Sequence, residues 1–296
     1  MAVSIEKKYQ KLTDTEHVLL RPGMYVGSIK PHTEEVFLPM KGKDQFQLTE
    51  VTYNPGFLKL FDEIVSNSVD EHKRNAKLNK VKVDIDMATG QISIWDNGGI
   101  PVKIHKEYDE WVPEMIFSNL KAGSNFDDTE DRVVVGTNGV GSTLTNIFSK
   151  EFIIETCDGK KQFVQTFKNN MSDRTKAKIT NKKTAFTKIT YLTDFERFGL
   201  KGINKNHYLM ITKRLIDIAA CNPTLKIFLN DKPIAFRTFK DYASRYVTPV
   251  FYDQSEHWKI GIGHSTTGFK AISFVNSVET KDGGTHVNNI DWQITS

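Results

Sequence analysis

The stretch from Tyr53 to about Lys77 restricts the fold most, because it predicts a long helix with two unlike faces. Asn54 is suited to cap this helix, and Pro55 is suited to its first position. Apolar side chains then recur at helical spacing, at Phe57, Leu60, Phe61 and Ile64. Such a stripe has to be buried against another layer of structure, so we expect this helix to face the core.

Strand patterns follow the helix. Val81, Val83 and Ile85 alternate with polar residues, and Ile92 and Ile94 resume the alternation after a Thr-Gly turn, which predicts a hairpin. Further strands are expected over 152–155, 163–167, 187–192 and 269–278, and helices over 114–120, 140–148 and 207–220. Residues 169–184 are polar and basic, and they predict an exposed hairpin or loop.

The length of 296 residues suggests two domains, with 1–246 as the first and 247–296 as the beginning of a second. Residues 1–20 are polar and charged, and they predict an N-terminal arm. No apolar run reaches the ~20 residues that a membrane-spanning helix needs, so we expect no membrane association. Two cysteines, Cys157 and Cys221, cannot build a disulfide framework or a cysteine zinc site, which favours a reducing, intracellular compartment.

Three polar motifs stand in order along the first domain. The first is Glu63, Asn67, Asp70 and Glu71 on the polar face of the long helix. A carboxylate one turn from a carboxamide suits nucleotide hydrolysis, because the Glu can activate water while the Asn oxygen ligates Mg²⁺. Taken alone, the motif is better explained as a solvated polar face.

The second motif, from Trp95 to Pro101, follows a β-branched strand and contains two consecutive glycines. Glycines allow a close approach of the backbone to a ligand, and Asp96 at the strand end can accept a hydrogen bond from an exocyclic amine such as that of adenine. In isolation, an ordinary Asn-Gly turn explains it better.

The third motif is the glycine-rich segment 136–143, which leads into a predicted helix and offers free amide groups to a polyphosphate. Its spacing and its lack of the P-loop lysine exclude a Walker motif, and its context argues against a dinucleotide-binding Rossmann domain. A flexible loop is the alternative for this motif alone. All three motifs in this order are hard to obtain by chance.

Together the three motifs resemble those of the GHKL (Bergerat-fold) ATPases. Segments 9–28, 120–128, 138–149, 186–191 and 274–287 narrow the resemblance to type IIA DNA topoisomerases, and chiefly to the eukaryotic-type and viral enzymes. The resemblance covers essentially the whole chain. It implies a two-layer α/β sandwich with a mixed sheet, followed by the start of a ribosomal-S5-like transducer domain.

The resemblance also implies roles for individual residues. Glu63 resembles the general base, Asn67 the Mg²⁺ ligand with Glu71 nearby, and Asp96 the adenine reader, supported through a water by Thr187. Gly99 and Ile100 belong to the adenine turn, and Ser124 and Asn125 resemble residues that reach the ribose and the phosphates. The phosphate-binding segment comprises Gly136, Thr137, Asn138, Gly139, Val140, Gly141, Ser142 and Thr143. Tyr9 lies in an arm that, in this family, crosses to the nucleotide site of the other protomer.

Some positions depart from the family pattern. The second motif is one residue shorter than usual, Gly123 replaces a serine, and Thr143 replaces a lysine. The transducer lysine that reaches the γ-phosphate and the DNA-cleaving tyrosine are not among these 296 residues, so this chain alone is expected not to cut DNA.

The resemblance predicts the ATP- and Mg²⁺-dependent N-terminal gate of a type II topoisomerase, which dimerises on nucleotide binding and acts on double-stranded DNA through the whole enzyme. A GHKL ATP switch of the chaperone or mismatch-repair type is the alternative. A pure nucleic-acid-binding domain is disfavoured, because 40 Lys and Arg against 36 Asp and Glu leave a net charge of only +4.

Overall fold

The computed structural model describes residues 5–9, 11–122, 139–234, 236, 238–255, 257–265 and 268–295. Within them, one nine-stranded sheet forms the centre of the molecule, with the strand order β10-β8-β7-β11-β4-β3-β12-β13 and β9 beside β8. Its strands are β3 (Lys80–Ile85), β4 (Gln91–Asp96), β7 (Ser149–Cys157), β8 (Lys161–Lys168), β9 (Asp173–Arg174), β10 (Lys178–Asn181), β11 (Phe186–Thr193), β12 (Lys226–Leu229) and β13 (Lys232–Ile234). The sheet is mixed, because β12 runs parallel to β3 while all other neighbouring strands of the sheet are antiparallel.

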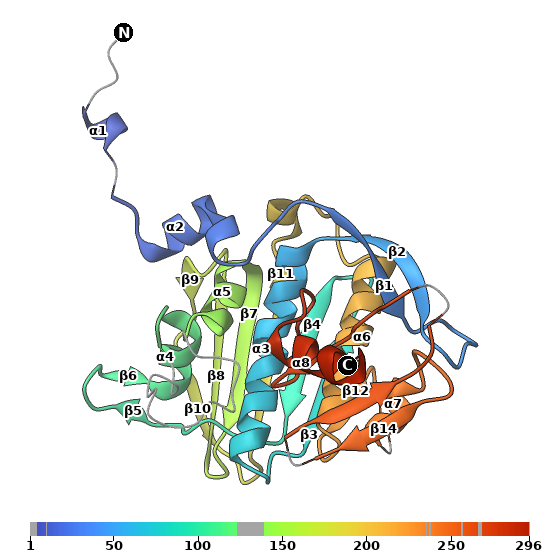
Figure 1. Ribbon diagram of the computed structural model, residues 1–296. Helices are drawn as coiled ribbons and strands as arrows, with labels where there is room; N and C mark the ends of the chain where they lie inside the picture. Colours follow the sequence, from blue (N-terminus) through green and yellow to red (C-terminus); the bar gives the residue numbers. More distant parts are fainter. Residues whose placement is uncertain are drawn as a thin grey trace.

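Helices cover one face of this sheet, which gives the predicted two layers (Figure 1). The long helix α3 (Pro55–Arg74) and helix α6 (Lys205–Cys221) lie side by side, and α5 (Gly141–Ile147) packs against α3. The apolar stripe predicted for α3 is buried in the main core, with all four side chains at most 3% exposed. The helix therefore has its polar residues on the faces that remain.

The start of α3 is fixed by a buried polar cluster. The Asn54 carboxamide accepts a hydrogen bond from the Phe57 backbone amide at 3.0 Å and donates to the carbonyls of Ile29 and Phe198 at 2.6 and 3.0 Å. The backbone amide of Asn54 donates a hydrogen bond to Nε2 of His207 on α6, at 3.0 Å. Burial lowers the pKa of His207 to about 4, which keeps the imidazole neutral and able to accept this bond.

The N-terminal region differs from the prediction. Helix α2 (Asp14–Leu20) has a capping box of Thr13 and Glu16, and its Val18 is fully buried in the main core. The arm is therefore shorter than residues 1–20, and α1 (Ile5–Lys8) stands apart from the body in Figure 1. The hairpin of β1 (His32–Leu38) and β2 (Gln47–Tyr53) was also not predicted.

The remaining elements are short. Residues 169–184 are mostly exposed, as expected, and their strands β9 and β10 both pair with β8, so this segment folds back along β8 as the second arm of a hairpin. Of the expected strand 269–278, only Phe274–Val275 (β16) and Val278, which begins the next short strand, are in a strand. The others are η1 (Pro22–Met24), β5 (Ile104–His105), β6 (Glu110–Trp111), α4 (Val112–Ser118), η2 (Phe195–Phe198), α7 (Phe239–Ala243), β14 (Phe251–Gln254), β15 (Lys259–Ile262), β17 (Val278–Glu279) and α8 (Thr285–Thr295).

The proposed domain boundary at residue 247 falls between α7 and β14 and stays a prediction. Among the described residues, no helix combines the length and apolar character needed to cross a bilayer.

Replacing Asn54 tests the buried cap. Asn54→Ala removes three side-chain hydrogen bonds in a site that is 1% exposed, so we expect it to lower the free energy of unfolding by about 2–3 kcal/mol. Asn204→Ala is the matched control, because Asn204 caps α6 through one bond at an exposed position, and it should cost about 1 kcal/mol. Urea unfolding measures both; equal losses would contradict the role given to Asn54.

Candidate functional site

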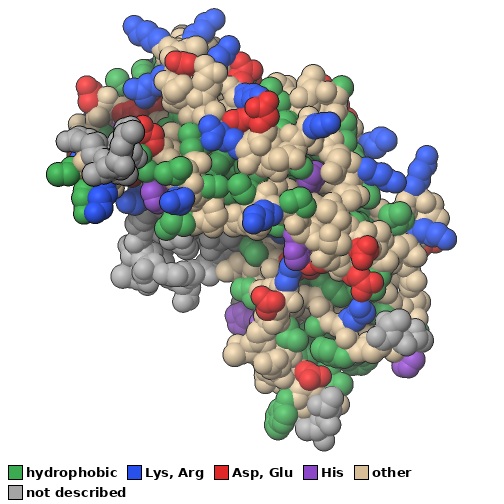
Figure 2. Space-filling view, turned by 90° about the horizontal axis from the view of Figure 1, so that it is seen from above, with side chains coloured by type: hydrophobic (Ala, Val, Ile, Leu, Met, Phe, Trp, Pro, Cys, Tyr) green, Lys and Arg blue, Asp and Glu red, His purple; other side chains and the backbone are tan. Residues whose placement is uncertain are grey.

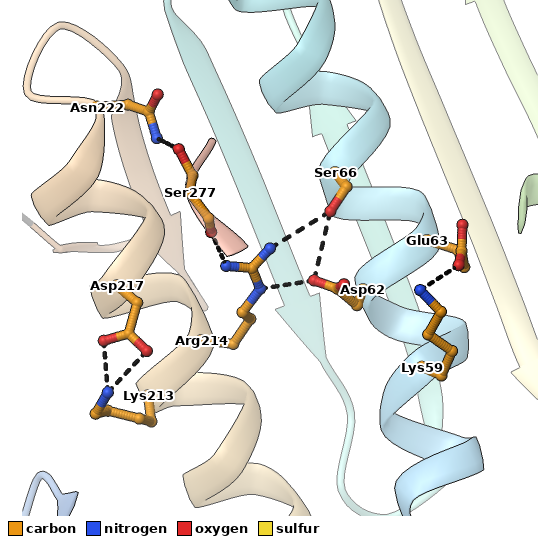
Figure 3. A network of polar contacts seen from close by, with 9 residues as sticks. All are labelled: Lys59, Asp62, Glu63, Ser66, Lys213, Arg214, Asp217, Asn222 and Ser277. Atoms are coloured by element: carbon orange, nitrogen blue, oxygen red, sulfur yellow. Dashed lines mark hydrogen bonds and ion pairs between the residues drawn. The ribbon is translucent and has the colours of Figure 1, made fainter. Parts of the chain in front are cut away.

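Glu63 and its neighbour Asp62 point to different sides of α3, as Figure 3 shows. Its carboxylate forms an ion pair with Lys59, one turn earlier, at 2.6 Å. The same carboxylate lies against Gly141 at the start of α5, so closely that a Cβ atom at Gly141 would overlap it. The first and third motifs are therefore in direct contact, and only glycine fits at position 141 without displacing Glu63.

Asn67 and Glu71 continue this face of α3 over the next two turns. Asn67 is exposed, whereas Glu71 is half-buried and accepts a long hydrogen bond of 3.4 Å from Asn75. Asp70 is buried, at 2% exposure. The side chain of Asn67 is thus available to a ligand beside Glu63.

Asp96 lies at the end of β4 and is 7% exposed. One carboxylate oxygen accepts a hydrogen bond from the Ser68 hydroxyl at 2.7 Å, and the other accepts one from the Gly98 amide at 2.9 Å. Burial raises the pKa of the Asp96 carboxyl to about 6, and the nearby charge of Glu71 acts in the same direction, against the hydrogen bonds from Ser68 and Gly98. Ser68 therefore connects α3 to the second motif.

Thr187 stands directly opposite Asp96 in the β11–β4 pair and opposite Thr156 in the β11–β7 pair. The two threonine hydroxyls are 3.0 Å apart, and the Thr156 hydroxyl also accepts a hydrogen bond from the Ile100 amide at 3.1 Å. A Cβ atom at Gly99 would overlap the Cys157 carbonyl oxygen. The shortened second motif is thus packed directly onto the end of β7, and its second glycine is required by that contact.

The described part of the third motif, 139–143, surrounds the start of α5. Gly139 has a positive φ of 60°, and Val140 packs against the main core. The hydroxyls of Ser142 and Thr143 donate to the carbonyls of Ile116 and Asn119 at 3.2 and 3.0 Å. The two side chains are therefore bonded to the protein itself. Backbone amides in the first turn of a helix have no partner within the helix, so those at the start of α5 can bind a ligand.

The other predicted residues either lie outside the described part of the chain or have no described contact with this site. Ser124, Asn125, Gly136, Thr137 and Asn138 lie outside the described residues. Tyr9 follows α1 directly, is 69% exposed and has Lys8 at 5.4 Å from its ring centroid. Its predicted contact with a second protomer stays a prediction.

Sequence reasoning missed three contributors to the site. Lys59 could have been found from its i,i+4 spacing to Glu63. Ser68 and Thr156 gave no such signal, because their hydrogen bonds join a helix to a strand and two strands to each other.

The donor set of the site can be compared with the needs of a metal ion. Among the described residues, no group of three His, Cys, Asp or Glu side chains could hold a metal on its own. Asn67 and the neighbouring carboxylates offer oxygen atoms only, and Mg²⁺ prefers oxygen ligands and often takes few from the protein, with the rest from phosphates and water. These residues therefore fit a Mg²⁺ ion that arrives with a nucleotide.

Comparisons with known proteins place these features in a family. A scan against descriptions of protein families gives no match. The chain is 43% identical to DNA topoisomerase 2 of Acanthamoeba polyphaga mimivirus over 99% of its length, and 40% identical to that of Arabidopsis thaliana. It spans 24% and 21% of those two proteins, which is less than a quarter of each.

The chain spans a larger share of the solved structures that it matches. The ATPase region of Saccharomyces cerevisiae topoisomerase II matches with a TM-score of 0.93 and 36% identity, over 98% of this chain and 80% of that one. The ATPase and transducer domains of topoisomerase II from Balamuthia mandrillaris match with a TM-score of 0.94 and 37% identity, over 99% and 78%. The ATPase domain of Thermus thermophilus gyrase B, 21% identical with a TM-score of 0.64 over 93% and 69%, supports the fold alone. The chain therefore belongs to the type II DNA topoisomerase family and matches the ATPase region of its members.

Proposed function

We propose that this chain binds and hydrolyses Mg·ATP as the N-terminal gate of a type II DNA topoisomerase. The observation that supports this most is the contact between Glu63 and Gly141, because it sets the Glu63 carboxylate beside the backbone amides at the start of α5. Asp96 is tied to the same helix through Ser68, five residues or roughly 8 Å of helix axis further on. The phosphate end and the base end of a nucleotide would then lie along α3.

Glu63 would act as the general base. Its carboxylate accepts a proton from a water that attacks the γ-phosphorus, while the bond to the bridging oxygen breaks and ADP leaves. Lys59 holds the carboxylate in place, and Asn67 would hold Mg²⁺ with Glu71 nearby. When bound, the ion neutralises negative charge on the phosphates.

Asp96 would read the base. Its carboxylate accepts a hydrogen bond from the exocyclic amine of adenine, with Thr187 supporting it through a water and with Gly99 and Ile100 along the adjoining turn. Guanine carries a carbonyl in place of that amine, so a buried carboxylate here repels it. Ser124, Asn125 and the amides of 136–143 are proposed to hold the ribose and phosphates.

Dimerisation and action on DNA are proposed for the whole enzyme, at the intracellular sites where its DNA substrate is found. Nucleotide binding favours a closed dimer in which the Tyr9 arm of one protomer reaches the nucleotide of the other. The alternative of a chaperone or mismatch-repair switch is not favoured, since the relatives that match over nearly the whole chain are topoisomerases. On the face in Figure 2, described lysines and arginines are interspersed with acidic side chains, which also disfavours a pure nucleic-acid-binding domain.

Replacing the general base separates binding from hydrolysis. Glu63→Gln keeps the size of the side chain but cannot take the proton, so we expect single-turnover ATP hydrolysis to fall by about 10²-fold or more while the Kd for a non-hydrolysable analogue changes little. Glu151→Gln is the control, because Glu151 also pairs with a lysine, Lys168, at 3.3 Å, but lies on β7 rather than on α3. Normal turnover by Glu63→Gln would refute the assignment.

Asp96→Asn tests base recognition. An amide can donate to the guanine carbonyl, so we expect the affinity for ATP to fall about tenfold or more and the preference for ATP over GTP to shrink. Isothermal titration with both nucleotides measures this, with Asp84→Asn on the exposed side of β3 as the control. An unchanged ATP-to-GTP ratio would speak against Asp96 as the adenine reader.

Light scattering tests the gate. With Mg²⁺ and a non-hydrolysable ATP analogue, we expect the solution mass to shift from monomer to dimer, and Tyr9→Ala to weaken that dimer. Tyr108→Ala is the control, because Tyr108 is similarly exposed, at 60%, but lies outside the arm. Saturation with the analogue and no change of mass would contradict the dimer proposal.

A further inference from the structure

The turn between β16 and β17 is held by three side chains from the helical layer. Asn276 and Ser277 have φ values of 51° and 71°, which residues other than glycine adopt at a cost and which a two-residue hairpin turn requires. Lys73 of α3 donates to the Asn276 carbonyl at 3.1 Å. Arg214 of α6 donates to the Ser277 carbonyl, and Asn222 donates to the Ser277 hydroxyl at 3.0 Å. Ser277 is 7% exposed, so this turn of the C-terminal segment is seated in the helical layer.

The Arg214 guanidinium also bonds to α3. Its Nε donates to Asp62 Oδ1 at 2.6 Å, and its Nη2 lies 3.5 Å from the Ser66 hydroxyl, which in turn lies 3.4 Å from Asp62 Oδ1 (Figure 3). The two charged side chains are only 18% and 23% exposed. One planar group therefore joins α6, α3 and the β16–β17 turn, and solvent weakens the ion pair less than it would at the surface.

Asp62 is the residue directly before Glu63. The two side chains leave α3 on different sides, Asp62 toward Arg214 and Glu63 toward Lys59 and Gly141. Since a helix moves as a rigid element over one or two turns, a displacement at Asp62 is passed to Glu63. Misplacement of a catalytic group by about 1 Å can cost roughly 10²-fold in rate.

We infer that Arg214 is a positioning residue, which couples the β16–β17 turn of the C-terminal segment to the Glu63 carboxylate and so makes ATP hydrolysis depend on where that segment sits. This inference rests on the proposed function of Glu63. Lys73 supports the coupling, because it gives α3 a second bond to the same turn.

The neighbouring residue Lys213 shows how specific this arrangement is. Lys213 is also buried, but it pairs with Asp217 on its own helix at 2.6 Å and lies within 6.0 Å of the ring centroids of Phe46, Tyr246 and Phe274. It therefore ties α6 to its surroundings, with no bond to α3 among the described residues. Arg214 is the member of this pair that faces the catalytic helix.

Arg214→Ala and Arg214→Lys in the full chain test the coupling. We expect Arg214→Ala to lower kcat for ATP by about 10- to 100-fold, with the Kd for a non-hydrolysable analogue within about threefold of the wild type. Arg214→Lys keeps the charge but not the planar fork, so it should recover part of the loss. Arg197→Ala is the matched control, because the Arg197 side chain pairs with Asp194 at a distance of 2.9 Å and, among the described residues, bonds to neither α3 nor the β16–β17 turn, so it should leave kcat unchanged.

A second pair of variants tests the link to the C-terminal segment and does not depend on the stability of Arg214→Ala. Proline cannot adopt the positive φ of Ser277, so Ser277→Pro should displace the carbonyl that Arg214 binds and lower kcat by a similar factor. Glycine adopts that φ readily, so Ser277→Gly should keep kcat within about twofold of the wild type. The Arg214→Ala and Ser277→Pro losses should not add in the double variant.

The outcomes separate the inference from the proposed function. A kcat loss in Arg214→Ala and Ser277→Pro, with unchanged analogue affinity and partial recovery in Arg214→Lys, supports the inference. If hydrolysis is lost in Glu63→Gln but remains at the wild-type rate in Arg214→Lys, Arg214→Ala and Ser277→Pro, the inference is overturned and the proposed function stands. Additive losses, or equal losses in Ser277→Gly and Ser277→Pro, also overturn it. Hydrolysis that persists in Glu63→Gln overturns the proposed function, and the inference with it.

Discussion

Helix α3 has one orientation on the sheet that buries Phe57, Leu60, Phe61 and Ile64 together, and the rest of the site depends on it. Turning the helix would expose these side chains at roughly 1.5–3 kcal/mol for each one fully transferred to water. With that face buried, Glu63 is directed to the start of α5, Ser68 to Asp96, and Asp62 to Arg214. Hydrophobic burial therefore sets the positions of groups that are themselves polar.

Several polar groups that are buried in this region are bonded to partners far away in the chain. Asp96 would be costly to bury alone, and its carboxylate oxygens accept bonds from Ser68 and Gly98. His207 is neutral inside the protein and accepts the Asn54 amide, which secures the first turn of α3. These bonds hold α3 at its first turn and in its C-terminal half while Asn67 on its polar face remains exposed, an arrangement that suits the proposed site, in which a ligand has to enter and leave.

The sequence predicted the elements whose patterns are strong. The structure confirms helix α3, its Asn54 cap, the β3–β4 hairpin and strand β11, which contains Thr187. Each of these shows clear periodicity or turn chemistry in the sequence. The β1–β2 hairpin was missed because His32–Leu38 and Gln47–Tyr53 alternate weakly and are largely exposed. Helix α2 was assigned to the arm because only Val18 of its seven residues is buried, and a helix this short shows no clear apolar stripe. Local periodicity is uninformative where few side chains are buried.

By itself the sequence determined the residue types of the site and their spacing along each element, with Glu63 one turn before Asn67, Asp96 at a strand end, and glycines at 139 and 141. It also carried the resemblance that the comparisons confirmed. Only the tertiary structure decided that Gly141 lies against Glu63, that Thr156 lies beside Thr187, and that Arg214 bridges Asp62 and Ser277. The reason is physical: helix and strand periods fix which residues share a face, whereas contacts between residues 78 or 152 positions apart depend on how whole elements pack.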